Sequence, residues 1–209
     1  MNKKTKIKQV IKNLKEMFPE VQTQLNYNNP FELLVATILS AQCTDKQVNN
    51  VTKKLFQRFK TPYDFAEGSI EELESLIKQT GYFHNKAKNI KECAKTVIEK
   101  FNGNVPDNMD DLLTLRGVGR KTANVVLNVI FNKGGIVVDT HVLRISRRLG
   151  FTDKKDPNKV EFDLMEIIPK NECIDFSLRL IYFGRSICKA IKPKCNECNF
   201  FDICIYEKK

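Results

Sequence analysis

The chain has 209 residues, 42% of them hydrophobic, which suffices for one compact domain or two modest ones. Its 35 Lys and Arg outnumber its 25 Asp and Glu, and the formal net charge is +10. This excess is typical of proteins that bind a polyanion such as nucleic acid, although many basic proteins bind no specific partner. No apolar run is long enough to span a membrane, so we expect no membrane partner.

Apolar residues recur with helical periodicity through most of the chain. This pattern predicts helices over residues 31–40, 48–59, 70–79, 86–100, 122–131 and 161–168. Residues that disfavour helices are expected between them, at Pro62, Gly81, Gly103, Pro106 and Pro157. The only strand-like run, residues 136–138, is too short to imply a sheet. The sequence therefore predicts an all-α fold.

Residues 115–123 read L-R-G-V-G-R-K-T-A, with helical spacing of apolar residues on both sides. Gly117 and Gly119 suit a very tight turn between two helices. Backbone N–H groups at the start of the second helix lack intrahelical acceptors, so an anion such as a phosphate binds there readily. The candidate contacts are Gly117, Val118, Gly119 and Arg120. An ordinary helix end followed by a turn explains the two glycines alone equally well.

Lys121 stands at the start of the second helix, where the helix dipole disfavours a protonated amine. A neutral lysine can attack carbon and form a Schiff base. The alternative is a solvated or phosphate-binding lysine. Asp139 strengthens the catalytic interpretation, because the helix over 122–131 is about 15 Å long and the extended segment after it can bring the chain back to Lys121. Asp139 also suits the N-cap of the helix that follows it, and the two roles are compatible.

Four of the seven cysteines fall in a short segment near the C-terminus, with the spacing C-x6-C-x2-C-x5-C: Cys188, Cys195, Cys198 and Cys204. Four thiolates suit a tetrahedral zinc ion or an iron–sulfur cluster. The spacing favours the cluster, because zinc ribbons more usually contain two C-x2-C pairs. Disulfides are disfavoured, since the first residues, M-N-K-K-T-K, are not an apolar signal segment and the number of cysteines is odd. Cys43, Cys93 and Cys173 lie among apolar residues and are expected to be buried structural thiols.

The hairpin with its lysine, the V-D-T-H segment at 138–141 and the cysteine tail together resemble the endonuclease III family. Its members are DNA glycosylases and abasic-site lyases of the helix-hairpin-helix superfamily. Residues 39–45, L-S-A-Q-C-T-D, are similar to the family motif L-S-A-Q-x-T-D, and residues 81–87, G-Y-F-H-N-K-A, match its DNA-inserting loop. The resemblance covers essentially the whole chain, with these motifs in the family's order.

The resemblance implies a mechanism. Lys121 would displace a damaged pyrimidine base by attack at C1′, Asp139 would assist it, and β-elimination would then nick the strand. Because the reacting atoms are inaccessible in a stacked duplex, the nucleotide must be flipped out. Gln42 and Tyr82 match the residues that fill the resulting gap; without the resemblance we would expect a surface or helix-capping amide and a partly buried aromatic ring. The family also implies a [4Fe-4S] cluster, mainly structural, on the four tail cysteines.

By resemblance, residues 22–133 form a helical domain with the hairpin at about 108–128, and residues 1–21 with 134–209 form a cluster domain. A DNA-binding cleft is expected between the two. Lys189, Lys192 and Lys194 lie between the first two tail cysteines and would grip the DNA backbone, although a solvated charge run is equally compatible with their spacing. The expected partner is duplex DNA with damaged bases or abasic sites. We expect a monomer in the bacterial cytoplasm, associated with the nucleoid through DNA.

The sequence departs from the family pattern at three positions. Arg116 replaces a proline, which removes a stiffening residue and offers a phosphate contact. Tyr82 stands where many members have leucine, so the resemblance does not fix the preferred damage. Phe183 stands where the family often has histidine, a change without a consequence that we can assign. Two alternatives are a mismatch-type monofunctional glycosylase, which lacks a lysine at the position of Lys121, and a non-enzymatic iron–sulfur protein that binds DNA.

Overall fold

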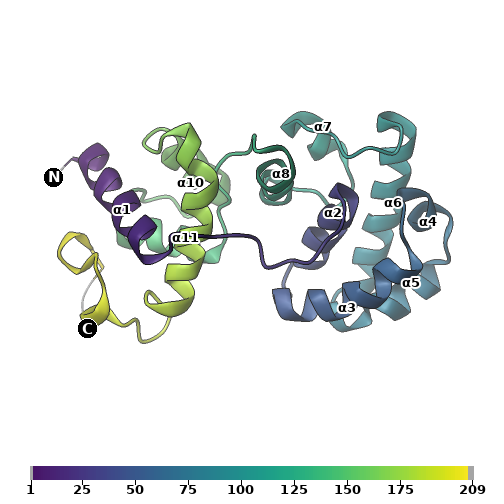
Figure 1. Ribbon diagram of the computed structural model, residues 1–209, viewed down its shortest axis with the longest axis horizontal. Helices are drawn as coiled ribbons and strands as arrows, with labels where there is room; N and C mark the ends of the chain where they lie inside the picture. The colour runs from purple at the N-terminus through teal and green to yellow at the C-terminus, as the bar shows by residue number, and fades with distance from the viewer. Residues whose placement is uncertain (1, 207–209) are drawn as a thin grey trace. The chain divides into compact units, whose positions relative to one another are not determined.

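The computed structural model describes residues 2–206 as helices joined by loops (Figure 1). Within these residues no strand is present, and the all-α prediction is confirmed. The chain forms two compact units. Unit 1 takes the chain up to Thr23 and again from Gly134 onward, and unit 2 is Gln24–Lys133. No helix within residues 2–206 is long and apolar enough to cross a membrane.

Unit 2 is a bundle of short helices around the buried helix α2. Its elements are α2 (Pro30–Leu39), α3 (Asp45–Arg58), α4 (Pro62–Glu67), α5 (Ile70–Ile77), the 3₁₀ turn η1 (Lys78–Thr80), α6 (Phe83–Phe101), α7 (Met109–Thr114), α8 (Arg120–Val126) and the π-helical turn η2 (Leu127–Phe131). Every residue of α2 from Phe31 to Leu39 is buried. Helices α3, α6 and α8 pack against α2, and α4 and α5 pack against α6.

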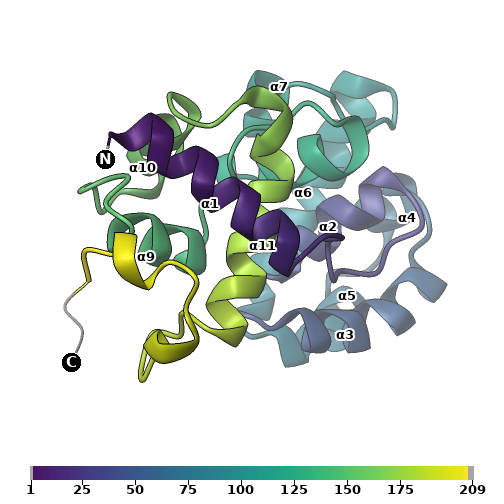
Figure 2. The same ribbon diagram turned by 60° about the vertical axis from the view of Figure 1, so that its left-hand side comes forward.

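Unit 1 is built around α11 (Cys173–Ser186). Helices α1 (Lys3–Met17) and α9 (Thr140–Arg148) pack against it (Figure 2), and α10 (Pro157–Met165) contributes Val160 and Leu164 to the same hydrophobic core. Short 3₁₀ turns complete the unit at Lys170–Glu172, Cys195–Glu197 and Phe201–Ile203. The guanidinium of Arg179 is buried and donates to the carbonyls of Phe18 and Pro19, which fixes the end of α1 against α11.

Polar side chains begin most of these helices. Asn29, Thr44 and Thr61 each accept a hydrogen bond from a backbone N–H in the first turn, and Asp64 completes a capping box with Thr61. Pro62 was expected between helices. It is instead the first residue of α4, a position where a proline loses no helical hydrogen bond.

The predicted helices over 31–40, 48–59, 70–79, 86–100 and 161–168 correspond to α2, α3, α5, α6 and α10, with ends shifted by a few residues. The largest shift is in α10, which begins at Pro157, a residue expected to lie outside the helix. Asp156 caps that helix, and proline suits its first position. The sequence did not predict α11, because half-buried apolar residues such as Ile174, Leu178 and Ile181 lie outside its buried stripe and obscure the helical period.

Candidate functional site

The predicted hairpin lies between α7 and α8. Leu115 and Val118 are buried and anchor it to the core of unit 2, whereas Gly117 and Gly119 are exposed. The Val118 N–H donates to the Leu115 carbonyl at 3.1 Å, and the Ala123 N–H donates to the Gly119 carbonyl at 2.9 Å. The hairpin thus presents backbone to solvent and turns its apolar side chains inward.

The two hairpin glycines have different structural requirements. Gly117 has a φ of +80°, and a Cβ there would lie 2.9 Å from the Cβ of Asn89 on α6. Gly119 has a φ of −102°, and a Cβ there would meet no atom within 4 Å. Arg116 contacts the same α6 residue, since its Nε donates to Asn89 Oδ1 at 3.2 Å. The fold therefore requires glycine at 117 but not at 119, where the missing side chain leaves room for a partner.

Lys121 is the second residue of α8, and its side chain is exposed. Within residues 2–206 it forms no ion pair. The N-cap, Gly119, provides no side-chain acceptor for the first N–H groups of α8. An exposed lysine amine therefore stands beside backbone donors that the helix itself does not use.

Asp139, in unit 1, is the N-cap of α9, as predicted. Its Oδ1 accepts from the backbone N–H groups of His141 and Val142, both at 2.8 Å. Within residues 2–206, Oδ2 makes no hydrogen bond. One carboxylate oxygen therefore starts the helix while the other remains available for chemistry.

Helix α9 links Asp139 to the cysteine segment. His141 Nδ1 lies 3.1 Å from an Arg144 nitrogen, and the same nitrogen donates to the Cys188 carbonyl at 2.8 Å. The pKa of His141 is lowered, chiefly by burial and also by the nearby Arg144 and Arg185 guanidiniums, although Asp139 opposes this shift. Burial therefore favours the neutral ring, in which Nδ1 can accept a hydrogen bond from Arg144.

Gln42 and Tyr82 share an uncommon backbone conformation in unit 2. Their φ angles are +54° and +49°, in the left-handed region that costs a non-glycine residue about 1–2 kcal/mol. Both side chains are exposed, Tyr82 by 67%, so the alternative of a partly buried aromatic ring is wrong. Thr44, not Gln42, caps α3. Strained backbone with exposed side chains is typical of residues that contact a partner.

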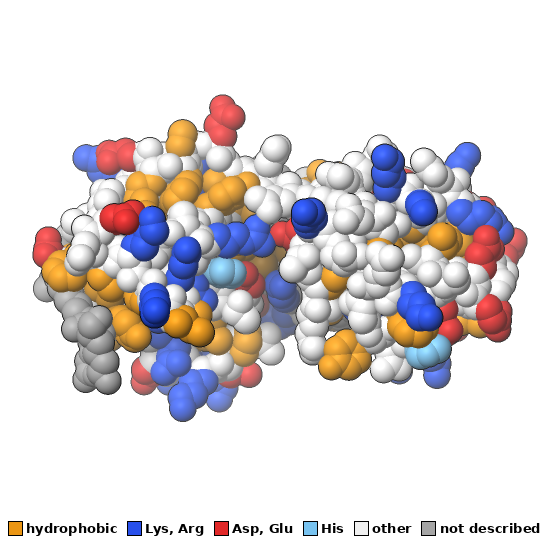
Figure 3. Space-filling view, turned by 90° about the horizontal axis from the view of Figure 1, so that it is seen from below, with side chains coloured by type: hydrophobic (Ala, Val, Ile, Leu, Met, Phe, Trp, Pro, Cys, Tyr) orange, Lys and Arg blue, Asp and Glu red, His pale blue; other side chains and the backbone are white. Residues whose placement is uncertain are grey.

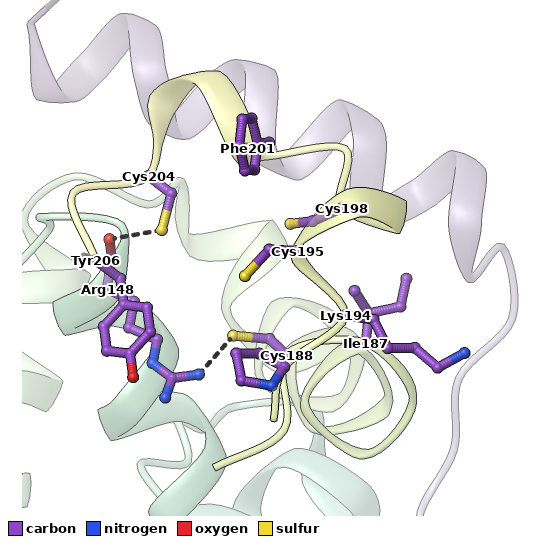
Figure 4. A pocket seen from close by; sticks show the side chains of 10 residues that line it. Arg148, Ile187, Cys188, Lys194, Cys195, Cys198, Phe201, Cys204 and Tyr206 are labelled. Atoms are coloured by element: carbon purple, nitrogen blue, oxygen red, sulfur yellow. Dashed lines mark hydrogen bonds between the residues drawn. The ribbon is translucent and has the colours of Figure 1, made fainter. Parts of the chain in front are cut away.

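The four tail cysteines line one small hollow (Figure 4). All four are half-buried free thiols. Arg148 donates to Cys188 Sγ at 3.3 Å, and the Phe200 N–H donates to Cys198 Sγ at 3.4 Å. Burial raises the pKa of the Cys198 thiol, and the other three cysteines raise it further. No group of three or more His, Cys, Asp or Glu side chains in residues 2–206 is arranged to hold a single metal ion.

The loop between Cys188 and Cys195 presents its lysines to solvent. Lys189, Lys192 and Lys194 are exposed, and Lys194 pairs with Glu197 at 3.0 Å. Arg148 donates to the carbonyls of Lys189 and Ala190, which fixes the start of the loop. Figure 3 shows several Lys and Arg side chains gathered on one face of unit 1, at the left. The loop is therefore basic, and hydrogen bonds from Arg148 fix its first residues.

Phe183, to which the sequence assigned no consequence, acquires a structural role. Phe183 is buried on α11 and packs edge-on against Phe200, with ring centroids 5.0 Å apart, so it supports the cysteine segment. Cys93 and Cys173 are buried as expected, and burial raises the pKa of Cys93 to about 12. Cys43 is only half-buried, contrary to expectation, because it lies in the loop that exposes Gln42.

Three comparisons with known proteins point to one family. The family model described as "HhH-GPD superfamily base excision DNA repair protein" matches residues 35–170. The chain is 48% identical to endonuclease III of Synechocystis sp. over 97% of its length and 93% of that protein. It is 50% identical to endonuclease III of Bacillus subtilis over 90% of its length and 87% of that protein.

A solved structure extends this similarity to three dimensions. It is titled as a trapped covalent intermediate of endonuclease III with DNA, an estranged-adenine complex. The match has a TM-score of 0.94 and 47% sequence identity, and it covers 98% of this chain and 97% of that one.

The contrast between the hairpin glycines predicts different effects of the same substitution. Gly117→Ala should lower the free energy of unfolding by about 1–3 kcal/mol, because alanine at positive φ is strained and its Cβ meets Asn89. Gly119→Ala should change it by less than about 0.5 kcal/mol. Urea denaturation followed by circular dichroism measures both. Equal losses in the two variants would contradict this account of the hairpin.

Proposed function

Because the chain belongs to the endonuclease III family of the HhH-GPD superfamily, we propose that its activity is that of a bifunctional DNA glycosylase and abasic-site lyase. It removes damaged pyrimidines from duplex DNA and nicks the strand. One observation carries this proposal: an exposed lysine follows the glycine hairpin in a chain similar over 98% of its length to an enzyme trapped covalently on DNA. The DNA substrate implies action in the bacterial cytoplasm, where we expect a monomer.

We propose Lys121 as the nucleophile. Its neutral amine forms a bond to C1′ as the bond from C1′ to the base breaks, and the base leaves with a proton. The sugar ring then opens to a Schiff base, which acidifies the proton on C2′. Loss of that proton expels the 3′ phosphate and leaves a nick. Exposure of Lys121 supports this role, because the amine must reach a flipped nucleotide.

We propose that Asp139 takes a proton from the attacking amine and stabilises positive charge developing on the sugar. The free Oδ2 supports this role, since Oδ1 is already committed to the start of α9. The helix cap also holds the carboxylate in one orientation. Precise orientation matters because proton transfer requires hydrogen-bond distance.

The remaining candidate residues are proposed to bind DNA. Gln42 and Tyr82 would enter the gap left by the flipped nucleotide. Backbone N–H groups of Gly117, Gly119 and Arg120 would hold a phosphate, with the open space at Gly119 allowing close approach, while the Val118 N–H is committed to the Leu115 carbonyl. The lysines of the 188–195 loop would contact the backbone, so affinity should fall as salt rises.

We propose that the four tail cysteines hold a [4Fe-4S] cluster. Four thiols around one hollow, with N–H groups directed at two of the sulfur atoms, fit such a group. When bound, the cluster would crosslink the end of α11 to the C-terminal segment. This supports the basic loop and involves no step of the reaction.

Neither alternative function has a specific observation in its favour. A monofunctional mismatch glycosylase would lack the lysine that stands at 121. A non-enzymatic iron–sulfur protein would need neither the exposed Lys121 amine nor the available oxygen of Asp139. Covalent trapping separates all three possibilities.

Lys121→Gln should abolish nicking of a duplex with one thymine glycol, and borohydride should no longer trap a covalent adduct. Duplex binding should persist, because the hairpin backbone is unchanged. Mass spectrometry of the trapped wild-type protein should locate the adduct at Lys121. The matched control is Lys133→Gln, which changes an exposed lysine of the same unit that pairs with Asp107. Nicking by purified Lys121→Gln would refute the mechanism.

Two substitutions of Asp139 should separate its two roles. Asparagine caps helices as well as aspartate does, so Asp139→Asn should change the free energy of unfolding by less than about 0.5 kcal/mol. Asp139→Ala should lower it by about 1 kcal/mol. Both should slow single-turnover base excision at least about 100-fold, because neither retains the carboxylate. Wild-type excision by the asparagine variant would exclude Asp139 from proton transfer.

Protein purified without oxygen should contain about four iron and four sulfide per chain. Cys204→Ser should lose most of this iron, whereas Cys43→Ser, outside the tail segment, should keep it. Metal analysis and the absorption spectrum measure both. Zinc in place of iron and sulfide would show that the four thiols hold a tetrahedral ion.

A further inference from the structure

Lys86 is the only lysine among the buried residues of the described chain, with 5% of its surface exposed. It lies in the first turn of α6. Its Nζ donates to the Leu39 carbonyl at 2.9 Å and to the Thr80 carbonyl at 2.8 Å. A buried ammonium is costly unless it is well hydrogen-bonded, so these two acceptors account for its presence in the core.

The two carbonyls precede the loops that carry Gln42 and Tyr82, both in the left-handed conformation. Leu39 is the last residue of α2, three positions before Gln42. Thr80 ends η1, two positions before Tyr82. The Lys86 backbone N–H also donates to the Tyr82 carbonyl, at 3.0 Å. One residue therefore bonds to the base of both loops, which lie about 40 positions apart in the sequence.

A second contact between the same regions is weaker. Gln47 Nε2 donates to Gln79 Oε1 at 2.8 Å, but this pair is exposed, so water competes for both groups. The Lys86 bonds are buried and charge-assisted, and they are therefore the stronger connection. Burial also lowers the pKa of Lys86, as expected for an amine enclosed by the core.

We propose that Lys86 is a positioning residue that fixes the Gln42 loop and the Tyr82 loop relative to each other, so that both side chains enter the DNA gap together. This rests on the proposed function, in which Gln42 and Tyr82 fill that gap. Lys86 itself, buried beneath the loops, touches no DNA. Its loss leaves each loop with its own residues but without their common anchor.

The test compares two lysines of α6 that donate to backbone carbonyls. Lys86→Met removes the anchor while keeping the length and apolar stem of the side chain. Lys91→Met, the matched control, removes a half-buried lysine that donates to the Gly68 carbonyl, away from both loops. Single-turnover excision of thymine glycol from a duplex should slow about tenfold in Lys86→Met. It should stay within about twofold of wild type in Lys91→Met.

A double-variant background distinguishes positioning from a general loss of stability. If Lys86 acts through the two loops, Lys86→Met should have less than about a twofold effect when Gln42 and Tyr82 are already alanine. A tenfold loss in both backgrounds would overturn the proposal, because it would show that Lys86 acts elsewhere. Wild-type excision rates in folded Lys86→Met would also overturn it. If Lys86→Met fails to fold, Lys86→Arg provides the same comparison, because its bulkier guanidinium displaces the two loops. It should slow excision in the wild-type background but not when Gln42 and Tyr82 are alanine.

Borohydride trapping on a single-stranded abasic oligonucleotide separates this inference from the proposed function. Such a strand has no stacked gap to fill, so Lys86→Met and wild type should trap equally there. Absence of trapping by the wild-type protein on both the strand and the duplex would refute the lyase function itself. If Lys86→Met failed to trap on the strand while the wild-type protein trapped there, Lys86 would take part in the reaction itself. That result would contradict a positioning role.

Discussion

Burial of α2 on all sides is the constraint on which unit 2 depends. Its sequence, P-F-E-L-L-V-A-T-I-L, leaves no face for solvent, so other helices must enclose it. The enclosing helices include α8, which carries Lys121, and α6, which begins just after Tyr82. The Gln42 loop leaves the C-terminal end of α2 itself. The proposed nucleophile and both proposed gap-filling residues thus lie on segments that join α2 or pack against it.

In unit 1, arginines serve as the connecting groups, and their acceptors are mostly backbone carbonyls. Arg144 and Arg148 of α9 donate to the carbonyls of Cys188, Lys189 and Ala190, and Arg179 holds the end of α1. A guanidinium has several donors in a fixed plane, so a single side chain can satisfy more than one carbonyl of an irregular segment. The cysteine segment has little regular structure of its own, and it needs such support. The net charge of the protein is therefore partly structural, and only part of it is available to DNA.

The features that the sequence predicted depend on local spacing. The hairpin and the cap by Asp139 could be predicted because a tight turn or a helix start has a characteristic pattern within a few residues. Lys86 was not predicted, since its partners are backbone carbonyls, one of them 47 positions away, and a carbonyl has no sequence signature. The left-handed backbone at Gln42 and Tyr82 was also unpredictable, because neither residue type favours it. The structural role of Phe183 was likewise unpredictable, because it depends on packing against Phe200, which is not a near neighbour in the sequence.

At several positions the structure assigns the requirements of folding and of chemistry to different atoms. Asp139 uses Oδ1 for the cap of α9 and leaves Oδ2 available. In the hairpin, the positive φ and the contact with Asn89 require glycine at 117, whereas neither constraint applies at Gly119. The Val118 side chain is buried in the core, while Gly117 and Gly119 on either side of it are exposed to solvent. Because the fold already fixes one part of each residue, the part proposed to contact DNA is held in a set orientation, and little further ordering is needed when DNA binds.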